Sequence, residues 1–404
     1  MRFLTAGESH GKSLTVIVDS VPANLKLSKE FIDKELFRRQ QGYGRGLRMK
    51  IETDQVEILS GIRYGKTLGS PIAMLIKNKD WENWLDVMAV EDIPSSRKKE
   101  KISVPRPGHA DLTGSMKFNF DDLRNSIERS SARETAARVA AGAVCKRFLE
   151  EFGISIGSYV ESLGSIHSKN PFSESLFSNR LPKGFRGADL SELSDKSDVR
   201  VLDSEQEEKI INRIKRAKKN GDTLGGTFFI AATGVPAGLG SFMQFDKKLN
   251  AAIASSIMSV HAVKGVEIGS GFLSSDKPGS EVHDEIILKD GVLSRASNRS
   301  GGIEGGISTG LPIIVRGAMK PIPTLMSPIG SVDLKTMKEI QSRRERSDFT
   351  AVPACAVIAE SMLAFTLADF FLEKFGGDSI EEIKERYKLY NASLMKNLRR
   401  NFRK

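Results

Sequence analysis

Hydrophobic and polar positions along this chain switch repeatedly between a period of two residues and a period near 3.6 residues. Apolar and β-branched runs bounded by glycine or polar turns predict strands, at residues 2–5, 14–18, 50–60, 70–76, 154–163, 225–234, 265–271 and 312–320. Apolar residues that recur every three or four positions predict helices, at residues 28–39, 120–148, 204–220, 247–259 and 352–375. Helices and strands therefore share the chain up to residue 375, as in a mixed α/β fold.

Some segment ends carry residue types that cap helices. Ser28 and Ser204 precede apolar-periodic stretches and are candidate N-caps. Glu207 stands at the capping-box position of the second stretch. Residues 84–104 and 170–191 lack a clear period, and we expect both stretches to run over the surface.

The order strand–helix–strand occurs twice, near residues 1–150 and near residues 155–270. This order predicts an α/β (or α+β) architecture with pseudo-duplicated strand–helix–strand units, although the two halves share no residue-level repeat. No linker rich in Pro or Ser and no change of composition separates the halves. We therefore expect a single domain over residues 1–404, in which residues 376–404 form a basic C-terminal tail that can be loosely ordered.

The composition indicates a cytoplasmic protein with a large core. Of the 404 residues 39% are hydrophobic and 28% are charged, and no run approaches the roughly 18 apolar residues of a membrane helix. The N-terminus lacks the charged-then-apolar layout of a signal peptide. Cys145 and Cys355 lie in runs of small apolar residues, where buried reduced thiols are expected. We expect no membrane partner.

The net charge of +10 does not by itself indicate a nucleic-acid-binding protein. Residues 384–404 contain eight Lys or Arg and one acidic residue, so this tail carries +7 and the rest of the chain +3. Only Tyr387, Tyr390 and Phe402 are interleaved with that charge, which offers few rings for bases to stack on. We expect no nucleic-acid partner. The alternative predicts salt-dependent binding that disappears when the tail is removed.

Other motifs are incomplete or missing. Residues 6–13, AGESHGKS, nearly match the phosphate-binding loop G-x-x-x-x-G-K-[ST], but Ala6 replaces its first glycine and a β-branched run follows Ser13 where a helix is required. Neither the G-x-S-x-G elbow of a serine hydrolase nor a strand–G-x-G-x-x-G–helix unit occurs. These absences disfavour hydrolysis and ordinary flavoprotein redox chemistry with a nicotinamide. No metal site is expected, because metal-ligand spacings are lacking.

Two of the five histidines lie in glycine loops. His10 is in GESHG and His109 in RPGHADLTG, where glycines allow the backbone to approach a ligand closely. Several arginines accompany each of them, so both are candidate catalytic residues. Polar surroundings predict that His167 and His283 lie at the surface, and His261 stays ambiguous.

Arginine-rich loops are typical of a pocket for anions, because the planar guanidinium fits carboxylate and phosphate groups. Ser130 and Ser131 add hydroxyl donors where a helix could begin. A glycine-rich stretch over residues 300–325 could pack its backbone against a flat ring. The arginines of these motifs are Arg38, Arg39, Arg45, Arg48, Arg106, Arg129, Arg133, Arg343, Arg344 and Arg346.

Six blocks of the sequence resemble, in order, the signature blocks of the chorismate synthase family. They are GESHG, RRQQGYGRGLRMKIETDQVEILSGIRYGKTLGSPI, RPGHADLTG, RSSARETAARVAAG, GGIEGGISTGLPIIVR and RSDFTAVPA. The resemblance extends from residue 1 to about residue 375. It implies a β-α-β sandwich, a homotetramer and a 1,4-elimination, in which 5-enolpyruvylshikimate 3-phosphate loses phosphate and a proton to give chorismate, the last step of the shikimate pathway.

The resemblance also implies FMN as cofactor, which has to be reduced although the reaction has no net redox change. No part of the sequence is left over for a flavin reductase domain. We therefore expect a monofunctional lyase that depends on an external flavin reductant, with NADPH only an indirect source of electrons.

Matching the motifs residue by residue implies roles for individual side chains. His10 resembles the family's histidine near the flavin, His109 the one near the leaving phosphate, and Asp348 the carboxylate tied to removal of the ring proton. The arginines that would grip the substrate are Arg39, Arg45, Arg48, Arg106, Arg133 and Arg344. The FMN contacts would be Arg129, Ser130, Ser131, His261, Ala262, Gly305, Lys320, Pro321, Ile322, Pro323, Thr324 and Arg346. A side-chain role for His261 is doubtful, because family members often carry a small amide there.

Overall fold

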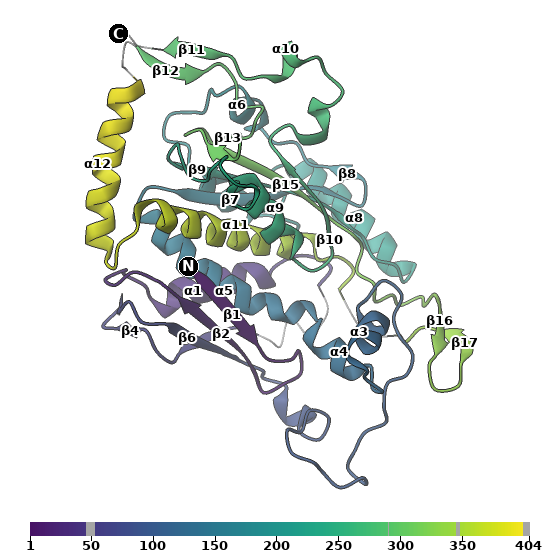
Figure 1. Cartoon of the computed structure of the whole chain (residues 1–404). Coiled ribbons are helices and arrows are strands. Elements are labelled where there is room, and N and C mark those ends of the chain that lie inside the picture. The colour runs from purple at the N-terminus through teal and green to yellow at the C-terminus, as the bar shows by residue number, and fades with distance from the viewer. Residues whose placement is uncertain (46–52, 290, 345–347, 399–404) are drawn as a thin grey trace.

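Two antiparallel sheets enclose a layer of helices (Figure 1). The structure is a computed structural model, and it describes residues 1–45, 53–289, 291–344 and 348–398. All strand ladders within these residues are antiparallel. The expected mixture of helices and strands is therefore confirmed, in its α+β form, whereas the internal duplication stays a prediction.

The N-terminal part of the chain builds the first sheet, which covers one face of the helical layer. Alternate residues of its strands are buried, so Leu14, Val16 and Val18 face the helices. At one edge only three residues of the strand predicted over 50–60 pair with a neighbour, and its first residues lie outside the described ranges. In sheet order the strands are β1 (Arg2–Ala6), β2 (Ser13–Asp19), β6 (Ile72–Lys77) and β3 (Val56–Ile58).

The second sheet covers the opposite face of the helical layer and is itself buried on both sides. Phe228 of β9 faces the main core, whereas the next residue, Phe229, packs with Leu176 and Leu190 in a second cluster. Residues 170–191 were expected to run over the surface, and most of them are at least partly exposed. They also cover the sheet, because an outer sheet face this apolar needs a cover. The cover is α6 (Ser173–Phe177) and α7 (Gly187–Ser194). In sheet order the strands are β10 (Val263–Ile268), β15 (Ile313–Met319), β9 (Gly226–Thr233), β7 (Ser155–Leu163) and β8 (Ile166–His167).

The middle layer consists of α1 (Lys29–Gln40), α5 (Thr135–Glu150) and α11 (Val352–Phe375). The alanine-rich helix α5 approaches α11 very closely at Gly142, where a β-carbon would lie 2.3 Å from that of Ser361. α11 is long and apolar enough to cross a membrane, so the expectation that no run reaches that length is wrong. Most of its residues are buried between the two sheets.

The helix predicted over residues 120–148 is interrupted. α4 (Arg124–Arg129) ends before two serines, and a 3₁₀ turn, η2 (Ala132–Glu134), leads into α5. The break occurs at Ser131, whose backbone is extended and whose hydroxyl accepts the N–H of Arg133 as an N-cap. The interruption places Ser130 and Ser131, both half-buried, at a corner of the chain rather than inside a helix.

Helix ends follow the predicted caps only in part. Ser28 caps α1 by accepting the N–H of Phe31. The helix predicted over 204–220 is confirmed as α8 (Ser204–Lys219), but its N-cap is Asp203 rather than Ser204. Glu207 accepts an N–H from a neighbouring loop instead of completing a capping box.

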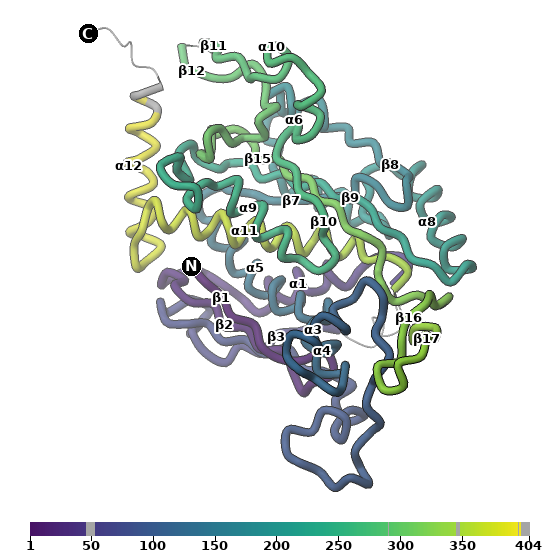
Figure 2. The backbone as a smooth tube through the Cα atoms, turned by 45° about the vertical axis from the view of Figure 1, so that its right-hand side comes forward, coloured from purple at the N-terminus to yellow at the C-terminus, as the bar shows by residue number. Residues whose placement is uncertain are grey.

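The basic C-terminal segment is a helix as far as the structure describes it. α12 (Ile380–Leu398) lies beside the end of α11 in both views (Figures 1 and 2). Tyr387 packs against Phe371 and Phe375, and the hydroxyl of Tyr390 donates to the carbonyl of Ala237 at 2.8 Å. Residues 399–404 lie outside the described ranges.

The remaining elements are short and connect or decorate the three layers. They are β4 (Ile62–Arg63), β5 (Lys66–Thr67), η1 (Trp81–Trp84), α3 (Asp111–Phe118), η3 (Phe245–Lys247), α9 (Leu249–Met258), η4 (Gly271–Ser274), α10 (Gly279–Val282), β11 (Ile286–Lys289), β12 (Val292–Arg295), β13 (Ile303–Glu304), β14 (Ile307–Ser308), β16 (Gly330–Asp333) and β17 (Lys338–Gln341).

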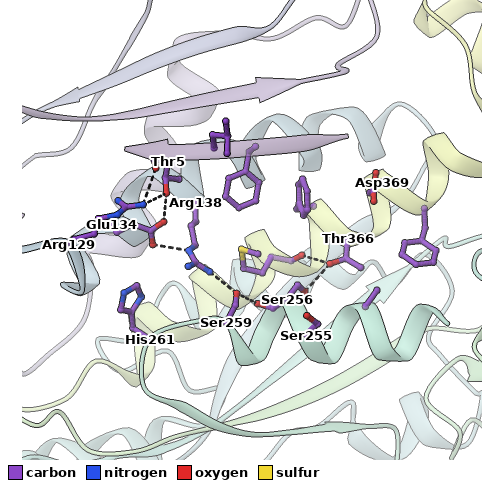
Figure 3. A pocket seen from close by; sticks show the side chains of 16 residues that line it. Thr5, Arg129, Glu134, Arg138, Ser255, Ser256, Ser259, His261, Thr366 and Asp369 are labelled. Atoms are coloured by element: carbon purple, nitrogen blue, oxygen red, sulfur yellow. Dashed lines mark hydrogen bonds and ion pairs between the residues drawn. The ribbon is translucent and has the colours of Figure 1, made fainter. Parts of the chain in front are cut away.

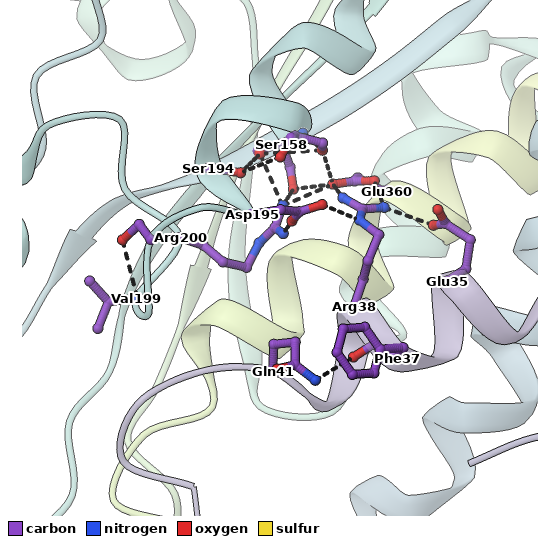
Figure 4. Close-up of polar contacts among 12 residues, drawn as sticks. Glu35, Phe37, Arg38, Gln41, Ser158, Ser194, Asp195, Val199, Arg200 and Glu360 are labelled. Atoms are coloured by element: carbon purple, nitrogen blue, oxygen red, sulfur yellow. Dashed lines mark hydrogen bonds and ion pairs between the residues drawn. The ribbon is translucent and has the colours of Figure 1, made fainter. Parts of the chain in front are cut away.

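A buried ionic network joins the helical layer to the second sheet (Figure 4). Glu360 of α11 is fully buried and accepts hydrogen bonds from Arg38 of α1, Lys146 of α5 and Arg200. Burial alone would raise the pKa of Glu360, but these cations hold it well below its ordinary value. Arg38 and Arg39 are consecutive residues in the last turn of α1. The network therefore fixes the turn that presents Arg39.

Candidate active site

His10 lies in the loop between β1 and β2, and one acidic side chain holds it. Its Nδ1 is 3.0 and 2.9 Å from the two carboxylate oxygens of Glu128, and its backbone N–H donates to the same carboxylate at 2.9 Å. Burial alone would raise the pKa of Glu128, but the hydrogen bonds from His10 lower it. An ionised carboxylate can only accept, so Nδ1 carries a proton. Nε2 is then the ring atom at which His10 can exchange a proton.

The second loop histidine has a similar carboxylate partner but a more basic neighbourhood. Nδ1 of His109 is 2.5 Å from Oδ1 of Asp111, the first residue of α3. Arg106 binds the same carboxylate through its backbone N–H, Nε and one terminal nitrogen, at 2.9–3.0 Å. Burial alone would raise the pKa of Asp111, but His109 and Arg106 hold it well below its ordinary value. The terminal nitrogen of Arg106 also lies within 3.3 Å of the His109 ring nitrogens.

A buried carboxylate brings two further arginines together. Asp54 receives the guanidinium of Arg133 at 2.6 Å and that of Arg39 at 3.3 Å. All three residues are at most 8% exposed. Arg39 also donates to the hydroxyl of Thr135 at the start of α5. Two guanidinium groups fixed around one carboxylate form a rigid positive corner that can receive further anions.

Asp348 is paired with an arginine from the loop after α1. Nε of Arg45 lies 3.1 Å from a carboxylate oxygen of Asp348. The neighbouring backbone ties the two loops together, since the N–H of Phe349 donates to the carbonyl of Gly44 at 2.8 Å. The side chains of Arg45 and Asp348 are only 10% and 20% exposed. The predicted pair of a substrate arginine and a catalytic carboxylate therefore lies in one place.

The arginine-rich segment after β17 sends one side chain inward and another outward. Arg343 is half-buried, and burial together with Arg106 lowers the pKa of its guanidinium. Arg344, the residue expected to bind substrate, is exposed. Arg346 and Arg48 lie outside the described residues. Arg343 is thus the member of this segment that shares an electrostatic environment with Arg106.

The segment from Lys320 to Thr324 closes over the His109 loop. The backbone N–H of Lys320 donates to the carbonyl of Ala262 at 2.9 Å, and its Nζ donates to the carbonyl of Gly108 at 2.6 Å. Arg106 donates to the hydroxyl of Thr324 at 3.2 Å. Ala262 has a positive φ of 65°, a conformation that costs a non-glycine residue energy and that clusters at functional sites.

A groove of about 730 Å³ lies beside these loops, between β1, α9 and α11 (Figure 3). Arg129, Glu134 and His261 stand near one end of it. Nδ1 of His261 is buried and has no hydrogen-bond partner among the residues that the structure describes. Burial lowers the pKa of His261 to about 4, with Glu134 opposing this shift and Arg138 adding to it. The ring of His261 is therefore neutral at physiological pH.

Comparisons with known proteins identify the family. A family model described as chorismate synthase matches residues 1–372. The chorismate synthase of Aquifex aeolicus (strain VF5) is 54% identical over 391 residues, which cover 96% of this chain and 97% of that protein. That of Enterococcus faecalis (strain ATCC 700802 / V583) is 52% identical over 398 residues, covering 97% and 100%. A crystal structure of chorismate synthase has a TM-score of 0.77 at 44% identity and covers 98% of both chains.

The chain belongs to the chorismate synthase family. The family expected from the six sequence blocks is thereby confirmed, and with it the enzyme class, a lyase. The similarity to these relatives covers nearly the whole chain, so it includes residues outside the six blocks.

Several of the residues expected from the chorismate synthase resemblance lie close to another residue of the same set. The links among them are Arg39 with Arg133, Arg45 with Asp348, Arg106 with His109 and Thr324, and Lys320 with Ala262. Ser130 donates to a carbonyl of α4, and Ser131 to the hydroxyl of Ser9. Pro321, Ile322 and Pro323 complete the segment over the His109 loop, with Pro321 exposed.

Gly305 is separated from the other expected FMN contacts within this chain. It lies in the tight turn between β13 and β14, and the carbonyl of its neighbour Gly306 accepts the N–H of Leu249 at the start of α9. His261 follows the other end of α9. A helix of 10 residues is about 15 Å long. The structure therefore does not bring Gly305 next to His261.

Three carboxylates near the expected site residues escaped the sequence analysis as functional residues. Arg343 was noted there among the arginines of the motifs, but Arg344 was the one expected to bind substrate. Glu128, Asp111 and Asp54 each hold an arginine or histidine of the expected set. Asp111 stands within the block RPGHADLTG and Glu128 directly before RSSARETAARVAAG, so the signal was an acidic residue among basic ones. Some of their partners lie far away in the sequence, and others lie in loops whose conformation brings the side chains together. Sequence spacing reveals neither kind of contact.

Proposed function

We propose that this chain converts 5-enolpyruvylshikimate 3-phosphate into chorismate by 1,4-elimination of phosphate, with reduced FMN as cofactor. The family membership supports the reaction, and the clustering of arginines around two buried carboxylates, Asp54 and Asp111, supports the binding of polyanions. Substrate and cofactor together carry two phosphates and two carboxylates. Burying so much negative charge requires fixed cations, which this site supplies.

The residues of the chain fit a flavin mononucleotide. Lys320, Arg129 and the hydroxyl of Ser131 offer cationic and neutral donors for a phosphate. The strained backbone at Ala262 and the orphaned Nδ1 of His261 lie beside them, as expected where a ligand completes the packing. When bound and reduced, FMN supplies electron density that favours departure of the phosphate.

The substrate's charged groups would be held by the two sets of arginines. Arg39 and Arg133, fixed by Asp54, present guanidinium groups whose orientation is set before any ligand arrives. Arg106, fixed by Asp111, stands next to His109. A departing phosphate is stabilised by cationic donors aimed at the place where its charge grows.

Proton chemistry falls to two histidines and one carboxylate. His109 keeps a proton at Nδ1 for Asp111 and can donate another from Nε2 to the leaving phosphate. His10 keeps a proton at Nδ1 for Glu128 and exchanges protons at Nε2. Asp348, held by Arg45, is the carboxylate assigned to removal of the ring proton.

The finer features of the resemblance belong to the same proposal. The enzyme is a single domain, assembles as a homotetramer, works in the cytoplasm and receives its reduced flavin from an external reductant. Purified protein given NADPH and oxidised FMN under anaerobic conditions, without a reductase, is then inactive. Chorismate formation in that mixture would contradict the monofunctional assignment.

The observation that carries the proposal is that Asp111 binds both His109 and Arg106. Lys320 lies next to them, since its Nζ donates to the carbonyl of Gly108. The test is an anaerobic assay with dithionite-reduced FMN and 5-enolpyruvylshikimate 3-phosphate, in which chorismate absorbance is followed. We expect turnover that requires reduced flavin, and at least about 10²-fold less in His109→Ala. Failure of the wild type to form chorismate in this assay would refute the proposal.

A further inference from the structure

The end of α4 holds the His10 loop through two consecutive residues. The guanidinium of Arg129 donates to the carbonyls of Thr5 and Gly7. The main-chain carbonyl of Glu128 accepts the N–H of the residue before His10 at 3.0 Å, and its carboxylate binds both the backbone and the ring of His10. Glu128 thus makes contacts at three points of a two-residue stretch.

An indole ring covers one face of the same histidine. The rings of His10 and Trp84 are stacked, with centroids 3.7 Å apart and planes inclined by 25°. Trp84 is itself oriented, since its Nε1–H donates to Asp80 at 2.8 Å. The ring of His10 can therefore neither turn about its bond without losing Glu128 nor tilt without losing the stack.

Among the described residues, Arg124 and Asp80 are charged groups in contact with this pair. Glu128 has 1% of its side chain exposed and His10 has 20%. Arg124, one turn earlier on α4, lies 3.5 Å from a Glu128 oxygen and faces the ring of Trp84 at 5.6 Å. Asp80 is occupied by the indole N–H. The close partner of the Glu128 carboxylate is therefore His10, whereas Arg124 is more distant.

We propose that Glu128 and Trp84 are positioning residues for His10: Glu128 fixes Nδ1 as a donor, and Trp84 fixes the plane of the ring, so that Nε2 has one direction in which to exchange a proton. This inference rests on the proposed role of His10 in the reaction. It differs from the arrangement at His109, where Arg106 shares the carboxylate of Asp111 through three hydrogen bonds. At Glu128 the nearer partner is His10, and Arg124 lies 3.5 Å away, so a double mutant with His10→Ala tests whether removing Glu128 acts through His10.

The first test reads the position of the ring without any turnover. The chain has two tryptophans, Trp81 and Trp84, so Trp81→Phe leaves Trp84 as the only indole. A ring stacked at 3.7 Å quenches indole emission by contact. In this background His10→Ala defines the unstacked signal, and we expect Glu128→Ala to move the emission of the protein toward that signal. Emission unchanged from the Trp81→Phe parent would show that Glu128 does not hold the ring.

The second test is kinetic and uses the reduced-FMN assay. We expect Glu128→Ala to lower kcat about 10²-fold while KM for the substrate changes by less than about threefold, because a group acting in the reaction rather than in binding is displaced. Glu128→Gln keeps an oxygen that can accept the Nδ1 proton, so its loss is about tenfold or less. Trp84→Phe keeps an aromatic face and is milder than Trp84→Ala. Circular dichroism checks that each variant is folded.

A double mutant separates positioning from general structural damage. If Glu128 acts through His10, adding Glu128→Ala to His10→Ala lowers kcat no further. Additive losses would mean that Glu128 has another role and would overturn the inference. The matched control is Glu161→Gln, another partly buried carboxylate, paired with Arg316 in the second sheet, which we expect to leave kcat unchanged.

The outcomes for this inference and for the proposed function differ. If His10→Ala turns over at the wild-type rate, the proposed role of His10 fails. If His10→Ala is slow but Glu128→Ala is as fast as the wild type, the positioning inference fails and the role of His10 stands.

Discussion

Removal of the Glu360 carboxylate should destabilise the whole molecule. This carboxylate is fully buried and is the common acceptor for Arg38, Lys146 and Arg200. The hydroxyl of Ser191 also donates to it. In Glu360→Ala the three cations stay buried and lose their common acceptor, so that Glu35 and Asp195 are left to balance three positive charges.

The size of the effect follows from the asymmetry of buried ion pairs. Removing one partner of such a pair costs about 3–5 kcal/mol, because the remaining charge stays in a medium of low dielectric constant. A folded domain is stable by only about 5–15 kcal/mol. Glu360→Gln keeps the volume and an acceptor oxygen, so it should be less destabilising than Glu360→Ala.

The Glu360 network also makes the free energy of unfolding depend on pH, with a definite sign. Burial would raise the pKa of Glu360, but Arg38, Lys146 and Arg200 hold it well below its ordinary value. The folded state therefore binds its proton less readily than the unfolded state. The stabilising contribution is complete above the unfolded carboxyl pKa of about 4.3 and is lost as the pH falls through the lower folded value.

Urea unfolding followed by circular dichroism, at one fixed protein concentration, measures these differences. The control is Glu373→Gln on the same helix, where the carboxylate and its partner Lys247 are both 50% exposed, and no change in the midpoint is expected. A Glu360→Ala variant within about 1 kcal/mol of the wild type would refute the reasoning, since a loss that small is typical of exposed pairs. An equal loss of unfolding free energy in Glu360→Ala and in the control Glu373→Gln would refute it as well.

Three further predictions concern binding, packing and titration. Asp54→Asn should raise KM for the substrate about tenfold or more with a smaller change in kcat, because the two arginines that Asp54 holds lose a charged acceptor; a kcat effect without a KM effect would contradict this. Gly142→Ala should lower the free energy of unfolding by about 1–3 kcal/mol, since the new β-carbon would meet that of Ser361 at 2.3 Å, whereas Gly330→Ala, where no atom of the described residues lies within 4 Å, should be neutral. The ring of His261 should stay neutral down to about pH 4 in an NMR titration, and protonation near pH 6.5 would show that it is not buried as described.

Long, strongly periodic segments could be predicted from the sequence, and α11 matches its predicted range of 352–375. The break at Ser131 could not be predicted, because alanine-rich sequence favours one continuous helix and the extended backbone there depends on a local cap. Within its described residues, the strand predicted from residue 50 pairs with β6 over Val56–Ile58 only. Propensity gives the type of an element, whereas its length is set by the neighbour against which it pairs.

At the site, basic and imidazole side chains could be found from motif composition, but their partners could not. His10 and His109 stand in glycine loops that attract notice. Asp54 lies far along the chain from Arg133, and only the fold brings them within 2.6 Å. The choice between Arg343 and Arg344 depends on which side chain turns inward after β17, which consecutive arginines do not reveal.

A crystal structure with FMN and 5-enolpyruvylshikimate 3-phosphate tests the central claim most directly. The account predicts the substrate phosphate within about 3 Å of donors on Arg106 and His109, and the flavin beside the loops that carry His10 and Lys320. Ligands seated together in a part of the molecule remote from both histidine loops would contradict it.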